Sequence, residues 1–301
     1  MAAKAMATMA AAGTSPAADF DEPLRRGAGA VAEPGAWRAP SMTFSYSAHI
    51  GYMFNEMPLE DRVAAAARNG FAAVEHPAPY SIPAGDMASL LAAAGVTYTQ
   101  FGLRSGNAAA GEKGLGIFPE RRDEFRRSVA EGIAYARTIG VDKLHAMSGV
   151  LPEAQRTQDH WDCYVENLAF AAREAGEHGI TIILEPMSSG AVPDYYIATP
   201  DRAAEVIDAV GAPNMGLLLD VFHTLSTGLD LDATLRQHAA RIVHVHIADL
   251  PGRHEPGTGT VDFDRLDTVL SEIGYGGALG CEYIPAGNTE DGLGWLKARL
   301  G

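Results

Sequence analysis

The chain has 301 residues, of which 47% are hydrophobic, and 23 Lys and Arg against 38 Asp and Glu give a net charge of −15. This composition excludes wholesale disorder, no apolar run is long enough to span a bilayer, and the acidic balance disfavours nucleic acid as a partner. Cys163 and Cys281 are too few and too far apart for a disulfide framework or a zinc cluster, so a reducing, cytoplasmic setting is expected. Because no apolar run could span a bilayer, no membrane association is expected either.

Residues 1–40 differ in composition from the rest of the chain, with fourteen Ala, four Gly and four Pro. The prolines interrupt any long helix, and the Ala-rich stretch lacks the Leu, Ile and Val of a secretory signal. We expect a flexible, disordered extension that contributes nothing to the chemistry, with Met42 as a plausible alternative start. The folded domain is then expected to span residues 41–301.

From residue 41 onward, short apolar runs alternate with helical patterns. The expected strands are 43–50, 71–76, 96–102, 142–148, 180–185, 215–220, 242–247 and 278–283. The expected helices lie near 58–69, 83–94, 120–138, 158–178, 200–210, 230–240, 262–273 and 290–299. Glycines between helix and strand mark several helix ends.

Eight strand–helix units in about 260 residues predict an α/β fold, a single (β/α)8 TIM barrel. A doubly wound open sheet is the structural alternative. It would usually show a glycine-rich fingerprint after the first strand, and Ile50-Gly51-Tyr52-Met53 is not one.

Four successive strands of this barrel are expected to end in a polar side chain. These side chains are Glu185, Asp220, His246 and Glu282. Each follows an apolar run, where an ionised group must be paired or metal-bound, and the active sites of such barrels lie at this end of the strands. Any one of them alone is as well explained by an ion pair or a structural histidine. Together, three oxygen ligands and one nitrogen ligand suit a divalent ion such as Mn²⁺ or Mg²⁺, or else Co²⁺.

Further polar residues fall around the same rim. The substrate-binding candidates are His49, His76, His223, Arg253 and Glu255. An arginine could hold a substrate carboxylate through two hydrogen bonds, although Arg253 could equally be a surface loop charge. The histidines could each be structural, and His244, which is deeper in its strand than His246, is expected to be so.

The residues also indicate a reaction type. No glycine-rich phosphate loop or nucleotide fingerprint is visible, so no nucleotide cofactor is expected. Two carboxylates facing each other across a metal suit enolisation next to a carbonyl, with Glu185 and Glu282 moving the proton. Return of the proton to the neighbouring carbon gives an isomerisation, and return to the opposite face gives an epimerisation.

Four motifs in order resemble the hydroxypyruvate isomerase family of the xylose-isomerase-like TIM-barrel superfamily. They are Leu184-Glu185-Pro186-Met187, Leu219-Asp220-Val221-Phe222-His223, His244-Val245-His246-Ile247-Ala248-Asp249 with the following Gly252–Gly257, and Gly280-Cys281-Glu282-Tyr283-Ile284-Pro285. Phe71–Glu75 and Thr289–Trp295 look like the same family, and the likeness covers about residues 42–296. The resemblance implies that Glu185 and Glu282 are paired acid/base carboxylates and also metal ligands, with Asp220 and His246 completing the site.

Three positions depart from the family pattern. Hydroxypyruvate isomerases usually carry Gln at the position of His246, whereas the ketose 3-epimerase branch carries His. His76 replaces a bulky apolar residue, and His49 stands where Asn is common. These departures concern the substrate more than the reaction type, so we expect an isomerase for a small hydroxy-oxo acid of the hydroxypyruvate or 2-oxo-tetronate type, or for a sugar.

Three alternatives stay open at this point. One is a ketose 3-epimerase that uses the same site. Another is an abasic-site endonuclease of the same superfamily, which would need more metal ligands and a basic groove, against a net charge of −15. The last is a barrel that binds sugar without turnover, against which the intact Glu185 and Glu282 speak. The expected partner is a small molecule, and a homo-oligomer is compatible with the sequence.

Overall fold

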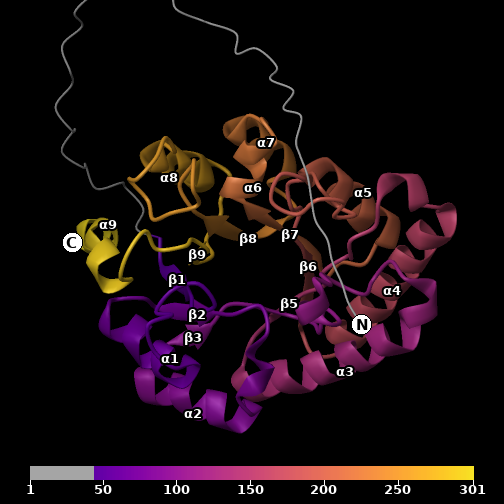
Figure 1. Ribbon diagram of the computed structural model, residues 1–301, viewed down its shortest axis with the longest axis horizontal. Helices are drawn as coiled ribbons and strands as arrows, with labels where there is room; N and C mark the ends of the chain where they lie inside the picture. The colour runs from indigo at the N-terminus through magenta and orange to yellow at the C-terminus, as the bar shows by residue number, and fades with distance from the viewer. Residues whose placement is uncertain (1–43) are drawn as a thin grey trace, which may run out of the picture. The chain divides into compact units, whose positions relative to one another are not determined.

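The computed structural model describes residues 44–301, so the expected extension over residues 1–40 lies outside the described residues. The described chain forms nine parallel strands surrounded by helices (Figure 1). The strands are β1 Tyr46–His49, β2 Ala73–Glu75, β3 Thr97–Tyr98, β4 Phe101–Gly102, β5 Lys143–His145, β6 Thr181–Leu184, β7 Met215–Asp220, β8 Ile242–Ile247 and β9 Leu279–Cys281. The helices are α1 Leu59–Arg68, α2 Ala84–Ala94, α3 Arg122–Ile139, α4 Gln158–Gly176, α5 Pro200–Val210, α6 Val221–Ser226, α7 Leu231–His238, α8 Phe263–Glu272 and α9 Gly294–Leu300.

The order of the strands closes the sheet into a barrel. The order is β3-β2-β1-β9-β8-β7-β6-β5-β4, so the two strands at its ends, β3 and β4, follow each other in the chain. Together they form the expected strand 96–102, interrupted at Thr99 and Gln100. The prediction of a single (β/α)8 barrel is therefore confirmed, with its third strand in two pieces.

The helix ends follow the signals in the sequence. Thr199 and Asp262 cap α5 and α8 by accepting hydrogen bonds from backbone N–H groups of the first turn. Gly140 ends α3 with a φ of 75°, in the left-handed region that glycine adopts without strain. Helix α6 was not expected, and it begins directly after β7 because Asp220 caps it.

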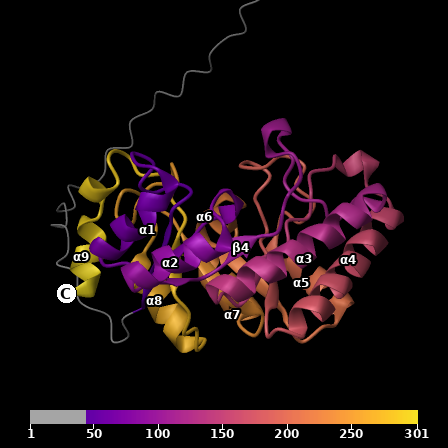
Figure 2. The same ribbon diagram turned by 90° about the horizontal axis from the view of Figure 1, so that it is seen from below.

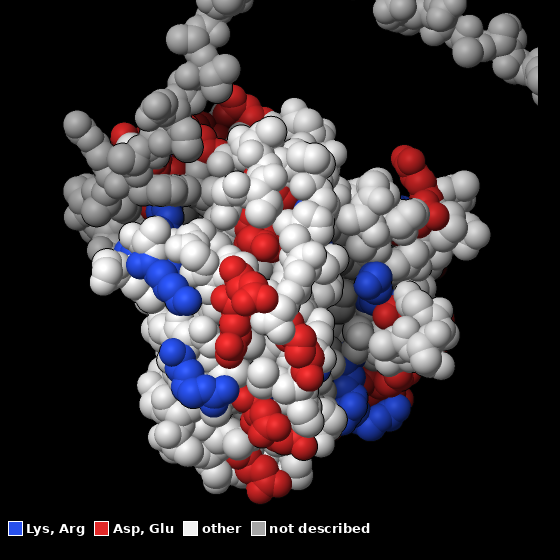
Figure 3. Space-filling view, turned by 60° about the vertical axis from the view of Figure 1, so that its left-hand side comes forward, with Lys and Arg blue, Asp and Glu red and all other residues white. Residues whose placement is uncertain are grey.

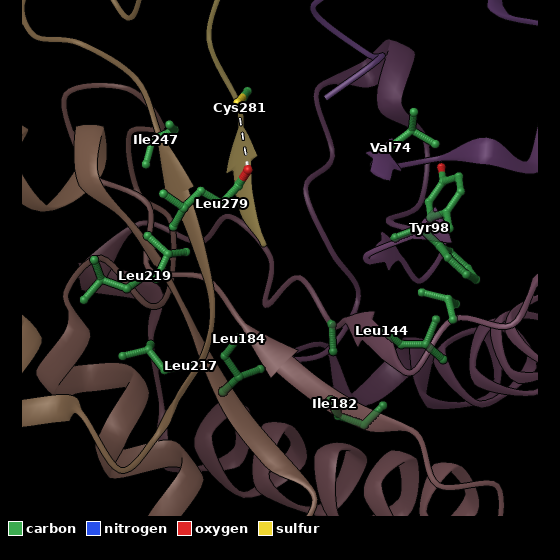
Figure 4. Packing of buried hydrophobic residues seen from close by; sticks show 14 of the residues in the cluster. Val74, Tyr98, Leu144, Ile182, Leu184, Leu217, Leu219, Ile247, Leu279 and Cys281 are labelled. Atoms are coloured by element: carbon green, nitrogen blue, oxygen red, sulfur yellow. Dashed lines mark hydrogen bonds between the residues drawn. The ribbon is translucent and has the colours of Figure 1, made fainter. Parts of the chain in front are cut away.

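Alternate side chains of each strand point to opposite sides of the barrel wall. In the close-up of Figure 4, Ile182 and Leu184 of β6, Leu217 and Leu219 of β7, and Cys281 of β9 belong to the buried apolar cluster between strands and helices. The residues between them in sequence face the barrel interior. Cys281 is buried in this cluster, so it lies on the opposite face from Glu282.

The surface carries charge of both signs. On the face drawn in Figure 3, acidic and basic side chains are interspersed among the described residues, without a continuous basic area. Within residues 44–301, no helix combines the length and the apolar character that crossing a membrane requires.

Candidate active site

The four polar residues expected at the strand ends come together at one end of the barrel. Glu185 directly follows β6, Asp220 is the last residue of β7, His246 is the last but one of β8, and Glu282 directly follows β9. One ligand atom from each lies within 4.8 Å of those of the other three. Three of these residues are almost fully buried, and the Glu282 side chain is 12% exposed.

His246 stands between the two glutamates. Its Nδ1 lies 3.1 Å from Oε2 of Glu282 and 3.6 Å from Oε1 of Glu185. Asp220 completes the group from β7, where its Oδ1 also accepts the backbone N–H groups of Phe222 and His223 at the start of α6. The aspartate is thus fixed by its capping role, and its second oxygen is turned to the site.

The charges of this cluster are strongly coupled. Burial raises the pKa of Glu282, but Arg253 and His246 outweigh it and hold that pKa well below 4.5. Burial lowers the pKa of His246, but Glu282 and Glu75 outweigh it and raise that pKa well above 6.5. Burial raises the pKa of Asp220. Three buried carboxylates at one point therefore require positive charge beside them.

A second carboxylate network lies deeper in the barrel, and the sequence did not predict it as part of the site. Glu75 of β2 is fully buried, and its Oε2 lies 2.8 Å from Nε2 of His244 and 3.5 Å from Nε2 of His246. Thr99 donates a hydrogen bond to the same oxygen at 2.8 Å. Glu75 therefore orients the far side of the His246 ring, and His244 lies beside it, deeper in the barrel than His246.

The Arg253 guanidinium lies over the carboxylates. Its Nη2 donates to Asp220 Oδ2 at 2.8 Å and also to Glu282 Oε2, and its Nε donates to the carbonyl of Glu282 at 3.2 Å. The loop that carries it is built on Asp249, whose carboxylate accepts four backbone N–H groups between Leu250 and Val261. Arg253 thus lies at the site as expected, but paired with two site carboxylates.

The remaining substrate-binding candidates fall into two groups. His49 and His223 line the cavity, with His49 Nε2 lying 3.4 Å from Glu282 Oε1 and His223 Nδ1 accepting from the backbone N–H of Ser188. His76 and Glu255 are not among the described residues of the cavity wall. The His76 ring stacks behind His49, and Glu255 accepts a hydrogen bond from the backbone N–H of Ala286 in the loop after β9.

A cavity of about 220 Å³ opens above the carboxylates. Sequence reasoning missed several polar residues of its wall: Tyr52, Gln100, Lys113 and His145. His145 is the last residue of β5, and the same strand-end argument would have found it had the expected strand not run on to residue 148.

The cluster fits a divalent metal ion. Its donors are three carboxylates and one imidazole, a set suited to divalent cations with open coordination positions. Oε1 of Glu185 is buried and has no hydrogen-bond partner within residues 44–301, so one site oxygen is left for a ligand. Glu185, Asp220, His246 and Glu282 are the residues that could hold such an ion.

Comparison with known proteins places this chain in a family. A family model of the xylose isomerase-like TIM barrel matches residues 63–299. A 2-oxo-tetronate isomerase from Cupriavidus necator is 38% identical over 257 residues, 85% of this chain and 98% of that protein. The hydroxypyruvate isomerase of Escherichia coli is 35% identical over 251 residues, 83% of this chain and 97% of that protein.

Among solved structures, the crystal structure of an AP endonuclease, family 2, from Brucella melitensis is similar in fold, with a TM-score of 0.82. It is 35% identical, and the match covers 84% of this chain and 98% of that one. The chain therefore belongs to the hydroxypyruvate isomerase family of xylose isomerase-like TIM barrels. The family predicted from the four strand-end motifs is confirmed.

Proposed function

We propose that this protein is a metal-dependent isomerase that moves the carbonyl between adjacent carbons of a small hydroxy-oxo acid, of the hydroxypyruvate or 2-oxo-tetronate type. The observation that carries the proposal is the pair of buried glutamates, Glu185 and Glu282, with His246 between them. The relatives named 2-oxo-tetronate isomerase and hydroxypyruvate isomerase support the same substrate class.

The residues of the site divide the reaction between them. One glutamate removes the carbon-bound proton next to the carbonyl, and this proton is returned to the former carbonyl carbon by the same glutamate or, after passing to it, by the facing one, while the hydroxyl proton moves to the neighbouring oxygen. A bound Mn²⁺ or Mg²⁺ would polarise the carbonyl and stabilise the negative charge of the enediolate. His49 and His223 face the cavity as hydrogen-bonding partners for substrate oxygens.

Two further features of the site bear on the reaction. The pKa of Glu282 is held well below 4.5, so this carboxylate is ionised and available as a base at neutral pH. Apolar side chains from Met147, Met187 and Val192 line the same cavity, so a substrate bound there would lie beside apolar surface as well as the carboxylates.

The test is exchange of solvent deuterium into hydroxypyruvate and 2-oxo-tetronate in the presence of Mn²⁺, followed by NMR. We expect exchange and isomerised product with the wild type, and loss of both after chelation of the metal. Glu185→Gln and Glu282→Gln should each lower the rate at least about 100-fold, the usual contribution of a positioned acid or base. Glu60→Gln, at an exposed glutamate of α1, should leave it unchanged.

Other outcomes would contradict the proposal. Exchange that survives both glutamine variants would remove the two glutamates from the reaction. Deuterium at carbon 3 of ketohexoses, with none in the hydroxy-oxo acids, would assign the site to a ketose 3-epimerase. Cleavage of DNA at abasic sites would assign it to the activity for which the Brucella protein is named.

A further inference from the structure

Lys113 carries a positive charge at the mouth of the cavity and takes no part in the proposed proton transfer. It lies in the loop of residues 103–121 between β4 and α3, which is drawn in purple near the top of Figure 2. The side chain lines the cavity above Glu185 and Glu282 and also borders an outer hollow of about 460 Å³. It is exposed and makes no hydrogen bond or ion pair with any residue between 44 and 301.

The residues on both sides of Lys113 are fixed. Glu112 accepts hydrogen bonds from the Arg121 guanidinium at 2.8 Å and from the backbone N–H of Asn107 at 2.6 Å. Gly114 donates its N–H to Ser105 and packs so closely on the segment after β5 that a Cβ there would lie 2.1 Å from the carbonyl oxygen of Met147. The loop therefore holds the backbone of an unpaired lysine at the cavity.

An acidic substrate needs a cation in this cavity. The floor carries the carboxylates of Glu185 and Glu282, which repel a substrate carboxylate unless positive charge offsets them. Among the described residues of the cavity wall, the arginine and lysine side chains are those of Arg253 and Lys113. Arg253 already donates to Asp220 and Glu282, whereas the ammonium group of Lys113 has its donors free.

We propose that Lys113 binds the carboxylate of the substrate and so selects hydroxy-oxo acids over uncharged sugars of the same length. The acid end of the substrate then lies at the mouth under the loop, and the carbonyl end lies between the two glutamates. This inference rests on the proposed function, because it assigns one end of that function's substrate. The residue that selects the substrate by its charge is therefore distinct from the two glutamates that transfer the proton.

The test compares two substrates that differ only in the charged group. Hydroxypyruvate and dihydroxyacetone share the same hydroxyketone, and dihydroxyacetone has a hydroxymethyl group in place of the carboxylate. Lys113→Met should raise KM for hydroxypyruvate about tenfold to 100-fold, the loss of one charge-assisted hydrogen bond, with kcat changed less than about threefold. KM for dihydroxyacetone should stay unchanged.

Two variants serve as controls. Lys113→Arg keeps the positive charge and should recover most of the affinity for hydroxypyruvate. Lys297→Met removes a lysine from α9, outside the cavity wall, and should leave both substrates unaffected. An unchanged KM for hydroxypyruvate in Lys113→Met, or an equal rise for both compounds, would overturn the assignment.

Failure of the proposed function would be recognised separately. If the wild type turned over neither compound, calorimetric titration with D-glycerate, an acid without a carbonyl group, would still measure the Lys113 contact. Weaker binding of D-glycerate by Lys113→Met than by the wild type would support the anchor without isomerase activity. Equal binding, or none by the wild type, would overturn it.

Discussion

Gly280 lies next to the site at a position where no side chain would fit. It precedes Cys281 on β9 and faces the barrel interior, two positions before Glu282. A Cβ built there would lie 2.1 Å from Oε1 of Glu75 and 2.5 Å from Cδ2 of His246, and side chains in a packed core cannot approach so closely. Glycine therefore makes room for the carboxylate–imidazole pair beneath the site.

We expect Gly280→Ala to displace the Glu75 carboxylate or the His246 ring. The substitution should destabilise the protein by about 1–3 kcal/mol, the usual cost of overpacking a core. It should also lower kcat roughly 100-fold, because His246 lies between the two glutamates and small misplacements are costly in a catalytic geometry. Urea unfolding and the deuterium-exchange assay measure the two effects.

Gly276→Ala is the matched control for this substitution. A Cβ at Gly276 would have no neighbour within 4 Å, so we expect a stability within about 0.5 kcal/mol of the wild type and an unchanged rate. A Gly280→Ala variant that matched Gly276→Ala in both measurements would show that the interior tolerates the extra methyl group.

The site residues differ in how far the sequence could predict them. Glu185, Asp220, His246 and Glu282 each end an apolar strand, so strand alternation and the barrel rule placed them together. Glu75 is the last residue of β2, but the expected strand runs on to residue 76, which makes His76 the polar residue at its end. The pairing of Arg253 with two site carboxylates depends on the path of a loop anchored at Asp249, which no periodicity in the sequence determines.

At the scale of elements, two loops join the first and last units of the barrel. Thr289, in the loop after β9, accepts a hydrogen bond from the buried N–H of Phe54 at 2.7 Å. Its own backbone N–H donates to Oε1 of Glu56 at 2.6 Å, and its hydroxyl lies 3.1 Å from the same oxygen. One threonine thus connects segments more than two hundred residues apart in sequence, next to the neighbouring strands β1 and β9.

We expect Thr289→Val to destabilise the barrel. The substitution keeps the shape of the side chain but leaves the Phe54 N–H without its acceptor, which costs about 1–3 kcal/mol for a buried group. The midpoint of urea unfolding checks this. Thr138→Val removes a hydroxyl that bonds only within α3 at an exposed position, and its effect should be clearly smaller. Equal midpoints for the two variants would refute the role of the loop contact.

The same contact predicts a dependence of stability on pH. Burial raises the pKa of Glu56, but the hydrogen bonds from Thr289 outweigh it and hold the pKa below its usual value of 4.5. The contribution of Glu56 is therefore fully present above pH 4.5 and is lost as the pH falls through the lower pKa of the folded state. Glu56→Gln should be less stable than the wild type at neutral pH, and the difference should shrink on acidification. A constant difference would show that ionisation of Glu56 does not contribute.

The elements themselves were largely predictable, and the exceptions have local causes. Apolar runs and glycine helix ends located eight strand–helix units, because both signals are set by neighbouring residues. The break at Thr99 and Gln100 arises from a contact with another strand, since both side chains donate to Glu75. Helix α6 has only six residues and depends on the Asp220 cap, so its pattern was too short to recognise.

At the scale of the whole molecule, the described residues contain a complete barrel. β1 pairs with β2 on one side and β9 on the other, so the first and last strands of the sequence are neighbours in the sheet. The helices surround this ring on all sides (Figure 1). All residues assigned to the cavity wall fall between His49 and Glu282.

This arrangement leads to a prediction for the segment before the barrel. A chain that begins at Met42 retains every described strand and the whole cavity wall, so we expect it to fold with the same urea midpoint as the full chain. Its kcat and KM in the deuterium-exchange assay should agree with those of the full chain to within about twofold, less than the loss of a single hydrogen bond would produce. A rise in KM with unchanged kcat would instead indicate that residues 1–41 contact the substrate. A lower urea midpoint would indicate that residues 1–41 stabilise the barrel. Either the rise in KM or the lower midpoint would contradict the expectation that the first forty residues take no part in the chemistry or the fold.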